Sequence, residues 1–503
     1  MADKITIGVI GAGTMGRGIV QLFAQSGHTV RCHDAQTGAA AKAIDYVDGM
    51  FARAVEKGRM AAAEHAAARD RLKACDSMAD LADCGLVIEA IVEDLDVKRT
   101  LFRELEDLVG EDTILASNTS SLTVAEIAAA CQRPQRVAGL HFFNPVPLMK
   151  VAEIIAAVRT APAVVRRLYE LTEEAGHRAV ITTDQPGFLI NHAGRGLYTE
   201  GLRIVEEQVA TPAEVDDVLR EALGFRMGPF ELLDLTGLDV SSRVMTSIYE
   251  QFYHEPRFRP SSLVAPRVAA GLFGRKSGEG WYPYVESQQQ KPPTKPVPPL
   301  PESLAVWVDS MASGAAGLRE LVLAAGARLA DDAANADLSI VQPWGQDATG
   351  TALALALDPT RCVAVDPLPP LALRRTLMLT AVTAPQARDA AHALLAKDGT
   401  PVTLINDSHG FIAQRVMATI VNIAANIAQR GIASVADLED AVRLGLGYPQ
   451  GPLGWGDRLG AGRMLEILRV QLAATGDPRY RPSAWLVRRV ALGLPLTTTE
   501  AAR

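Results

Sequence analysis

The feature that most constrains the fold is an apolar strand that runs directly into a glycine-rich turn close to the N-terminus. Residues 5–10 are apolar apart from Thr6 and Gly8. A G-x-G-x-x-G pattern follows at once, as Gly11, Ala12, Gly13, Thr14, Met15 and Gly16. A strand, this turn and a helix together bind pyrophosphate, because the helix N-terminus favours anions and the glycines let the backbone approach the phosphates. We therefore expect a dinucleotide-binding α/β domain.

The next predicted strand ends at an acid that suits a ribose. Residues 29–33 form this strand, and Asp34 stands 18 residues after Gly16 (34 − 16). The expected spacing for a ribose-binding carboxylate is roughly 20 residues. The carboxylate would repel a 2′-phosphate, and residues 35–38 contain no Arg or Lys, so we expect NAD rather than NADP. The alternative is an ordinary strand–helix turn with a solvated Asp34.

Length, charge and cysteine content limit the class of protein. A chain of 503 residues is too long for one core, which predicts three or four domains. The formal net charge of −8, without a basic tract, argues against nucleic acid as a partner. The five cysteines lack C-x-x-C spacing, which predicts neither disulfides nor a metal site. No apolar stretch has the length of a membrane span, so we expect a cytoplasmic protein.

The pattern of apolar residues divides the chain into five ranges. Residues 1–184 alternate short apolar runs with helical patterns, which predicts a doubly wound, Rossmann-type sheet with strands at 5–10, 29–33, 86–90 and 113–117. Residues 185–285 have helical periodicity and predict an all-α domain. Residues 286–302 contain six prolines and predict an extended linker. Two further ranges, 303–405 and 406–503, follow it.

The last two ranges repeat the first two. Gly187-Phe188 recurs as Gly410-Phe411, and Gly228-Pro229 recurs as Gly451-Pro452, both at a shift of 223 (410 − 187). Predicted strands at 304–308, 338–341, 362–365 and 401–405 make the third range a second Rossmann-like domain. None of them is followed by G-x-G-x-x-G. We therefore expect a tandem duplication whose second α/β domain is degenerate and has lost the cofactor turn.

A histidine and a glutamate carry the predicted chemistry. His141 follows a predicted strand at 137–140, and Glu153 lies in an otherwise apolar strand at 150–155. An imidazole paired with a buried carboxylate has a defined tautomer and a stabilised protonated form, as a general base for alcohol oxidation requires. A histidine that only makes local hydrogen bonds is the alternative, but an acid on an apolar strand is rarely buried without a partner.

Two further polar groups are candidates for the site. Ser120 belongs to a polar run after the predicted strand at 113–117, at the sheet edge where such folds bind ligands. By itself this run is equally well explained as a helix cap. Asn191 opens the first helix of the predicted all-α domain, where it either reaches the cleft or faces solvent.

These motifs resemble those of the L-3-hydroxyacyl-CoA dehydrogenase family. The resemblance covers residues 1–285, and its motifs stand in the family's order and spacing at 11–16, 89–93, 117–122, 141–145 and 187–191. It implies that His141 is the catalytic base, that Glu153 pairs with it, and that Ser120 and Asn191 hydrogen-bond the reacting oxygen. It also implies an NAD site lined by Asp34, Ala90, Glu93, Lys98, Ser120 and Asn144. His192 stands where the family usually has Arg.

The full length resembles a long bacterial form of the family, the 3-hydroxybutyryl-CoA and 3-hydroxyadipyl-CoA dehydrogenases, including that of phenylacetate degradation. Helical domains pair between subunits in short members, so we expect residues 406–503 to pack against 185–285 as a pseudo-dimer. At the shift of 223, Thr376 replaces Glu153 and Gln414 replaces Asn191. The second half is therefore expected to be inactive.

The substrate-binding residues are predicted from charge alone. Arg53, Lys57 and Arg59 lie in a helical insert and could bind CoA phosphates, although a solvated basic face explains them equally well. Arg195 lies one turn after Asn191 and could bind a terminal carboxylate. The function predicted is NAD-dependent oxidation of an L-3-hydroxyacyl-CoA. The alternatives are a dehydrogenase of a non-CoA 3-hydroxy acid and a non-catalytic NAD-binding protein.

Overall fold

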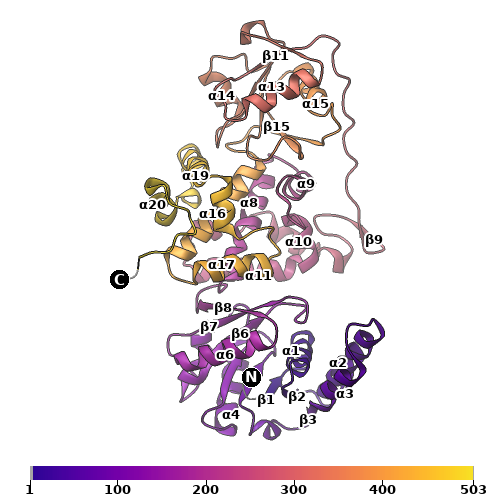
Figure 1. Cartoon of the computed structure of the whole chain (residues 1–503), viewed down its shortest axis with the longest axis vertical. Helices are drawn as coiled ribbons and strands as arrows, with labels where there is room; N and C mark the ends of the chain where they lie inside the picture. Colours follow the sequence, from indigo (N-terminus) through magenta and orange to yellow (C-terminus); the bar gives the residue numbers. More distant parts are fainter. Residues whose placement is uncertain (1–3, 502–503) are drawn as a thin grey trace. The chain divides into compact units, whose positions relative to one another are not determined.

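The computed structural model describes residues 4–501. Two compact units make up the chain. One extends to His192 and also includes Arg430–Leu446, and the other runs from Ala193 to Gln429 and resumes at Gly447. Figure 1 labels many of the elements of both.

The first unit contains an eight-stranded sheet in the order β3-β2-β1-β4-β5-β6-β7-β8. Its strands are β1 (Thr6–Ile10), β2 (Thr29–His33), β3 (Leu72–Cys75), β4 (Leu86–Glu89), β5 (Ile114–Ser117), β6 (Val137–Phe142), β7 (Val151–Ala156) and β8 (Arg178–Thr183). All neighbours are parallel except β6 and β7. The predicted Rossmann-type sheet is confirmed. Strands β3 and β8 were not predicted. Strand β3 is only four residues long and includes Lys73, and the apolar residues of β8 are flanked by Arg178 and two threonines.

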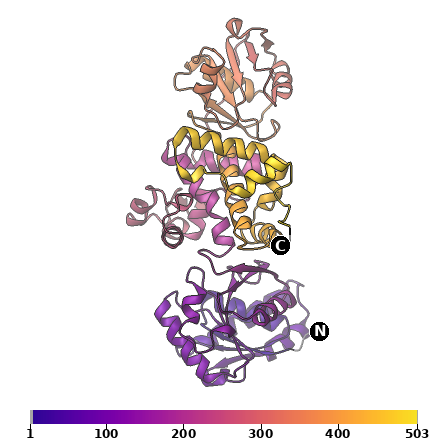
Figure 2. The same cartoon turned by 90° about the vertical axis from the view of Figure 1, so that its left-hand side faces the viewer.

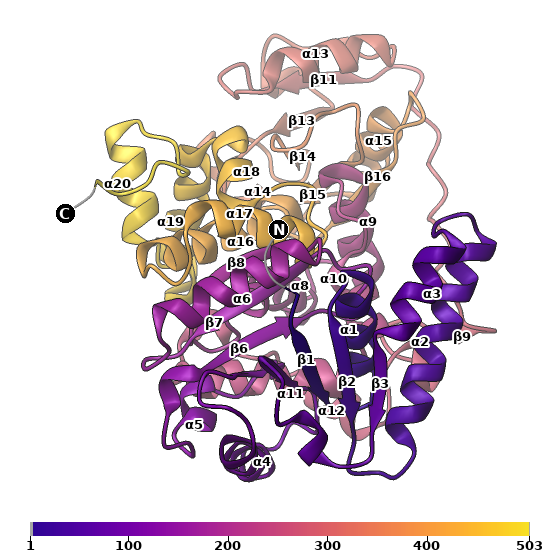
Figure 3. The same ribbon diagram turned by 60° about the horizontal axis from the view of Figure 1, so that its bottom comes forward.

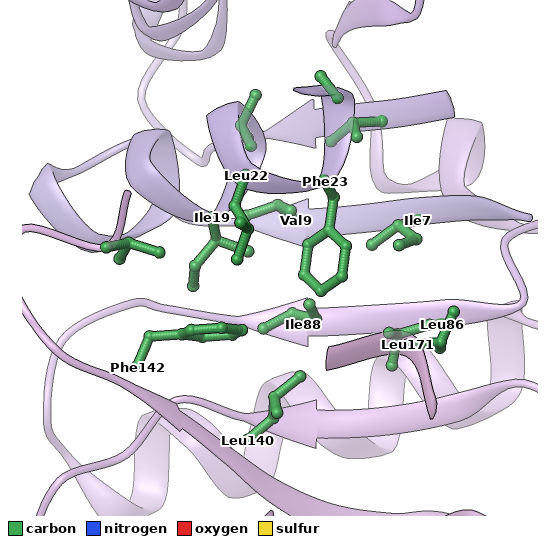
Figure 4. Close-up of a cluster of buried hydrophobic side chains, with 14 of the residues drawn as sticks. Ile7, Val9, Ile19, Leu22, Phe23, Leu86, Ile88, Leu140, Phe142 and Leu171 are labelled. Carbon is green, nitrogen blue, oxygen red and sulfur yellow. The ribbon is translucent and has the colours of Figure 1, made fainter. Parts of the chain in front are cut away.

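Helices cover this sheet and bury its apolar face. They are α1 (Thr14–Gln25), α2 (Ala39–Glu56), α3 (Ala62–Asp70), α4 (Leu95–Leu108), α5 (Val124–Ala128), α6 (Pro162–Glu174), α7 (Ile190–Ala193) and α17 (Val435–Gly445). Figure 3 shows α2 beside strands β2 and β3. In the core, Phe23 of α1 meets Phe142 of β6 edge-on, with ring centroids 6.1 Å apart (Figure 4). Complete burial of one such side chain stabilises the fold by about 1.5–3 kcal/mol, so the core fixes α1 and β6 together.

The second unit combines two sets of helices. The first set is α8 (Arg195–Glu206), α9 (Pro212–Leu223), α10 (Pro229–Thr236), α11 (Leu238–Gln251) and α12 (Val264–Ala269), and the second is α16 (Ile412–Gln429), α18 (Pro452–Leu459), α19 (Ala461–Thr475) and α20 (Ala484–Leu492). Helices α8 and α16 pack closely. At their contact, a Cβ on Gly196 would lie only 3.0 Å from the Ile420 Cα. In Figure 2 the C-terminal helices, in yellow and orange, lie beside the magenta helices of the first set.

The same unit contains a six-stranded sheet in the order β12-β11-β13-β14-β15-β16. Its strands are β11 (Ala305–Val308), β12 (Arg328–Leu329), β13 (Leu338–Val341), β14 (Cys362–Val365), β15 (Arg375–Leu379) and β16 (Val402–Ile405), with helices α13 (Ala315–Ala324), α14 (Ala348–Ala354) and α15 (Pro385–Leu395). Only β14 and β15 are antiparallel neighbours. This sheet has two strands fewer than the first.

The proline-rich stretch lies outside the helices and strands, and a hairpin precedes it. Strands β9 (Tyr284–Val285) and β10 (Gln288–Gln289) form a small hairpin over the first residues of the predicted range 286–302. Residues 290–304 contain no helix or strand. Proline cannot donate a ladder hydrogen bond, which explains why pairing stops before Pro292.

Candidate active site

The glycines of the turn after β1 serve two different structural purposes. A Cβ on Gly11, at a φ of 101°, would lie 2.4 Å from the Ala90 carbonyl oxygen. A Cβ on Gly16 would lie 1.8 Å from the Gly11 carbonyl oxygen. These two glycines are required by the packing of the turn itself. Gly13 is different, because nothing lies within 4 Å of its Cβ position, so the turn is open on that side to a ligand.

A cavity of about 980 Å³ lies against this turn. Of the residues predicted for the cofactor, it is lined by Gly11, Gly13, Asp34 and Ala90, and other walls come from β2 and α4. The Asp34 carboxylate accepts hydrogen bonds from the backbone N–H of Ala12 at 2.7 Å and of Gln36 at 2.8 Å. The predicted ribose-binding acid is therefore held at the edge of a cavity that is large enough for a dinucleotide.

Two of the predicted cofactor residues belong to a buried ion network. The Lys98 ammonium, only 1% exposed, lies 2.6 Å from Glu89 Oε1 and 3.2 Å from Glu93 Oε2. The Ser117 hydroxyl donates to the other Glu89 oxygen at 2.6 Å. A buried charge of this kind needs its partners, because one left alone is strongly destabilising. Lys98 thus neutralises two carboxylates, one at the end of β4 and one in the loop that follows it.

Glu93 holds the loop that carries Ser120. Its Oε1 accepts hydrogen bonds from the Thr119 hydroxyl at 2.7 Å and from the backbone N–H groups of Ser120 at 2.8 Å and Ser121 at 3.0 Å. Burial by itself would raise the pKa of Glu93, but the Lys98 ammonium and these hydrogen bonds lower it below its usual value. The ionised carboxylate therefore sets the conformation of the loop.

The structure brings His141 and Glu153 together. The antiparallel register of β6 and β7 places the two residues opposite each other, and His141 Nδ1 lies 2.6 Å from Glu153 Oε2. Both side chains are buried. The second oxygen, Glu153 Oε1, accepts hydrogen bonds from the backbone N–H groups of Leu189 at 2.9 Å and Ile190 at 2.8 Å. Such a carboxylate is fully satisfied and orients the imidazole.

Three neighbouring contacts define the surroundings of the imidazole. Asn118 Oδ1 accepts a hydrogen bond from the Phe142 N–H at 2.8 Å, which ties the Ser120 loop to β6. The rings of Phe143 and Phe188 lie 4.4 Å and 5.9 Å from the His141 ring. The site is therefore apolar around one polar pair.

The other predicted residues have different environments. Asn191, half-buried, directly follows Ile190 in α7, and Asn144 is exposed after β6. Arg53 in α2 and Lys57 just beyond it are exposed. Arg195 is buried in the second unit, with its guanidinium 5.0 Å from the Tyr198 ring centroid, and burial lowers its pKa. Arg195 and His141 thus belong to different compact units.

Sequence reasoning missed the backbone donors to Glu153. The only signal for them was the Gly187-Phe188 turn, which introduces Leu189 and Ile190. It also missed the burial of Lys98, since nothing in a helical sequence pattern marks which lysine will be enclosed. Among residues 4–501, no cluster of three His, Cys, Asp or Glu side chains could hold a metal ion, and no helix is long and apolar enough to cross a bilayer.

Comparison with known proteins identifies the family. The sequence model of the 3-hydroxyacyl-CoA dehydrogenase NAD binding domain matches residues 6–185. That of the 3-hydroxyacyl-CoA dehydrogenase C-terminal domain matches two stretches, residues 187–284 and 410–501. The chain belongs to the 3-hydroxyacyl-CoA dehydrogenase family of NAD-dependent oxidoreductases. The resemblance deduced from the motifs is thereby confirmed.

Individual relatives match either nearly the whole chain or about half of it. The chain is 36% identical to 3-hydroxyadipyl-CoA dehydrogenase of Escherichia coli K12 over 98% of both proteins. It is 38% identical to 3-hydroxybutyryl-CoA dehydrogenase of Clostridioides difficile, over 55% of this chain and 99% of that protein. Among solved structures, 3-hydroxybutyryl-CoA dehydrogenase from E. coli K12 has a TM-score of 0.85 at 35% identity and covers 98% of this chain and 99% of its own.

Proposed function

We propose that His141 is the general base that removes the proton of the substrate's C3 hydroxyl. The observation that carries the proposal is the 2.6 Å hydrogen bond between His141 Nδ1 and Glu153. Because a carboxylate can only accept, Nδ1 carries the hydrogen and Nε2 keeps the lone pair that receives the proton. Glu153 then stabilises the imidazolium that forms. NAD supplies the hydride acceptor for C3 when it is bound.

The remaining predicted residues bind or orient. We assign Ser120 and Asn191 to the reacting oxygen as hydrogen-bond donors. Asp34 would hold the adenosine ribose. The turn from Gly11 to Gly16, which includes Thr14 and Met15, would hold the pyrophosphate. Ala90, Glu93, Lys98 and Asn144 complete the NAD site. The open space at Gly13 and the position of Asp34 on the cavity wall support this arrangement.

The substrate class we propose is a short L-3-hydroxyacyl-CoA, either 3-hydroxybutyryl-CoA or 3-hydroxyadipyl-CoA, the acyl groups named for the relatives. Arg53 and Lys57, both exposed, would bind phosphates of CoA. Arg195 would bind the terminal carboxylate of an adipyl chain, because a buried guanidinium favours an anion. All five cysteines are unpaired and buried, which supports a reducing, cytoplasmic location.

We also propose that the chain is a tandem duplication, with the five ranges 1–184, 185–285, 286–302, 303–405 and 406–503. Reciprocal contacts support it. The Thr183 N–H donates to the Ile432 carbonyl at 2.9 Å, and the Asn406 N–H donates to the Val209 carbonyl at 2.9 Å. Each residue has its counterpart 223 positions away. Exchange of i and j is the signature of an isologous pairing.

The helical domains of the two halves also pack against each other. The close packing of α8 and α16 supports an intrachain pseudo-dimer of the helical domains. The second α/β domain is the degenerate copy, since Thr376 and Gln414 replace Glu153 and Asn191.

Turnover measurements test the proposed base. His141→Gln should lower kcat by about 10³-fold, the usual size of general-base catalysis, whereas the exposed control His254→Gln should leave kcat unchanged. Loss of NAD reduction in His141→Gln alone would exclude a non-catalytic NAD-binding protein. Equal activity of His141→Gln and wild type would refute the assignment.

A substrate series tests the acyl group. Turnover of 3-hydroxybutyryl-CoA, 3-hydroxyadipyl-CoA and free 3-hydroxybutyrate should show activity with the esters only. Arg195→Ala should impair the adipyl ester far more than the butyryl ester. If it impairs both esters equally, Arg195 does not recognise the carboxylate.

A further inference from the structure

One segment of the second half belongs to the compact unit of the first sheet. Residues Arg430–Leu446, which we name the returning segment, group with the residues up to His192. The segment pairs with β8, the edge strand of the eight-stranded sheet, through an antiparallel bridge between Thr182 and Ala433. The Thr183 N–H also donates to the Ile432 carbonyl at 2.9 Å. The edge of the catalytic sheet is thus completed by residues far away in the sequence.

An ion cluster fixes the helix of the returning segment. Arg178 of β8 lies 2.6 Å from Asp437 and 3.0 Å from Asp440, both on α17. Partial burial lowers the pKa of Arg178, but the two carboxylates raise it further than burial lowers it. The Ser434 side chain caps α17 by accepting the Asp437 N–H at 3.0 Å. These contacts define both the position and the start of α17.

The other end of α17 touches the residues that hold Glu153. A Cβ on Gly445, the last residue of α17, would lie 2.6 Å from Ile190 Cδ1 and 3.2 Å from its Cγ2. Ile190 is buried, and its backbone N–H donates to Glu153 Oε1 at 2.8 Å. Glu153 in turn binds His141 at 2.6 Å. A continuous series of contacts therefore leads from Gly445 to the imidazole.

We propose that the returning segment positions the catalytic pair, with Gly445, Asp437 and Asp440 as positioning residues. By this proposal the second half, although it lacks a base of its own, supplies the surface against which Ile190 is held. The proposal rests on the proposed roles of His141 and Glu153. It is specific to Gly445, because its counterpart in α9 is Ala222. The helix as such does not require a glycine there.

The first experiment compares Gly445→Ala with Gly462→Ala in the full chain. Gly462 lies in α19, and nothing lies within 4 Å of its Cβ position. Alanine favours both helices, so only the contact with Ile190 distinguishes the two variants. We expect kcat of Gly445→Ala to fall about tenfold, because small displacements of catalytic groups have large effects. The KM for NAD should change by less than about twofold, since the cofactor cavity is lined by other residues.

Rescue distinguishes positioning from damage to the fold. Ile190→Val removes Cδ1, the atom nearest to the added methyl group, so Gly445→Ala/Ile190→Val should regain much of the lost kcat. A second, independent variant is Asp437→Asn/Asp440→Asn, which releases Arg178 and should lower kcat by about threefold. Its control is Glu466→Gln, which breaks an exposed pair with Arg463 in the second half.

The outcomes separate this proposal from the proposed function. If Gly445→Ala has the kcat of Gly462→Ala, or if its loss is shared by NAD affinity and not restored by Ile190→Val, positioning by the returning segment is refuted. If His141→Gln retains activity, the assignment of the base fails instead. Loss of activity in His141→Gln, together with a rescued loss in Gly445→Ala, supports both.

Discussion

The antiparallel strand pairs β6–β7 and β14–β15 have the same backbone arrangement but carry different side chains. In the first pair His141 faces Glu153. In the second pair the Asp366 N–H donates to the Thr376 carbonyl at 3.1 Å, so Asp366 occupies the register position of the histidine and Thr376 that of the glutamate. The two pairs share a backbone arrangement, but the His–Glu pair is found in the first and not in the second, as expected where function depends on a few side chains rather than on the fold.

The space beside the second strand pair is occupied by hydrogen-bonded side chains. Gln414, the counterpart of Asn191, donates to Asp366 Oδ1 at 3.0 Å and to the Pro343 carbonyl at 3.1 Å, and accepts the Gly345 N–H at 2.8 Å. In front of α13, the Gln342 amide lies 2.7 Å from the Cβ position of Gly314, whereas Gly13 faces open space in front of α1. Polar side chains thus occupy the space beside Asp366 and in front of α13.

The largest expected effect separates Glu153 from Thr376, the residue at the same register position in the second pair. Glu153→Gln should lower kcat by about 10³–10⁴-fold, since the amide cannot stabilise an imidazolium. Thr376→Val should leave kcat unchanged. It should also leave the free energy of unfolding nearly unchanged, because the buried Thr376 hydroxyl has no hydrogen-bond partner. Steady-state kinetics of both variants measure this. A comparable loss in Thr376→Val would end the distinction between the halves.

Ion pairs provide the next test. Lys98→Met leaves Glu89 and Glu93 without their cation and should lower the free energy of unfolding by about 3–5 kcal/mol. On α15, which packs against the second sheet, Arg388 pairs with Asp389 at 2.8 Å, and the two side chains are 43% and 45% exposed. Asp389→Asn should therefore lower the free energy of unfolding by less than about 1 kcal/mol. Urea unfolding followed by circular dichroism compares the two, and equal effects would contradict the assignment of a buried network.

Alanine at the two helix entrances sharpens the comparison of the cofactor turns. A Cβ on Gly16 would overlap the Gly11 carbonyl oxygen, so Gly16→Ala should raise the Kd for NAD by about 100-fold. Gly314→Ala meets only the flexible end of Gln342 and should leave NAD binding unchanged. Fluorescence titration with NADH measures both. Tight binding by Gly16→Ala would show that the turn is not the pyrophosphate site.

The smallest expected effect is a pH dependence in the second sheet. Burial raises the pKa of Asp366 to about 7, and its Oδ2 has no hydrogen-bond partner. Between about pH 4 and pH 7 the folded state therefore keeps a proton that the unfolded state has released. The free energy of unfolding consequently falls as pH rises through that range. Asp366→Asn should add on the order of 2 kcal/mol to the free energy of unfolding at pH 8 and little at pH 4. Denaturation at both pH values measures it, and equal gains would contradict the shift.

Local patterns predicted a large part of the fold and of the site. Strand β1, its glycine turn and Asp34 were recognisable because their spacing follows from backbone geometry alone. His141 and Glu153 were paired correctly because both lie on adjacent apolar strands. The repeat at a shift of 223 made the second set of strands visible, apart from β12 and β15. Arg375 begins β15 with a buried charge, which a search for apolar runs does not find.

The sequence by itself therefore predicted the dinucleotide turn, the pairing of His141 with Glu153 and the internal repeat of motifs, since each depends on residues close together or on a repeated spacing. Only the tertiary structure decided that Lys98 is enclosed by two carboxylates and that α17 joins the first sheet. Arg178 and Asp437 are 259 residues apart. Such a contact is selected by packing of whole elements, for which no local periodicity or spacing exists.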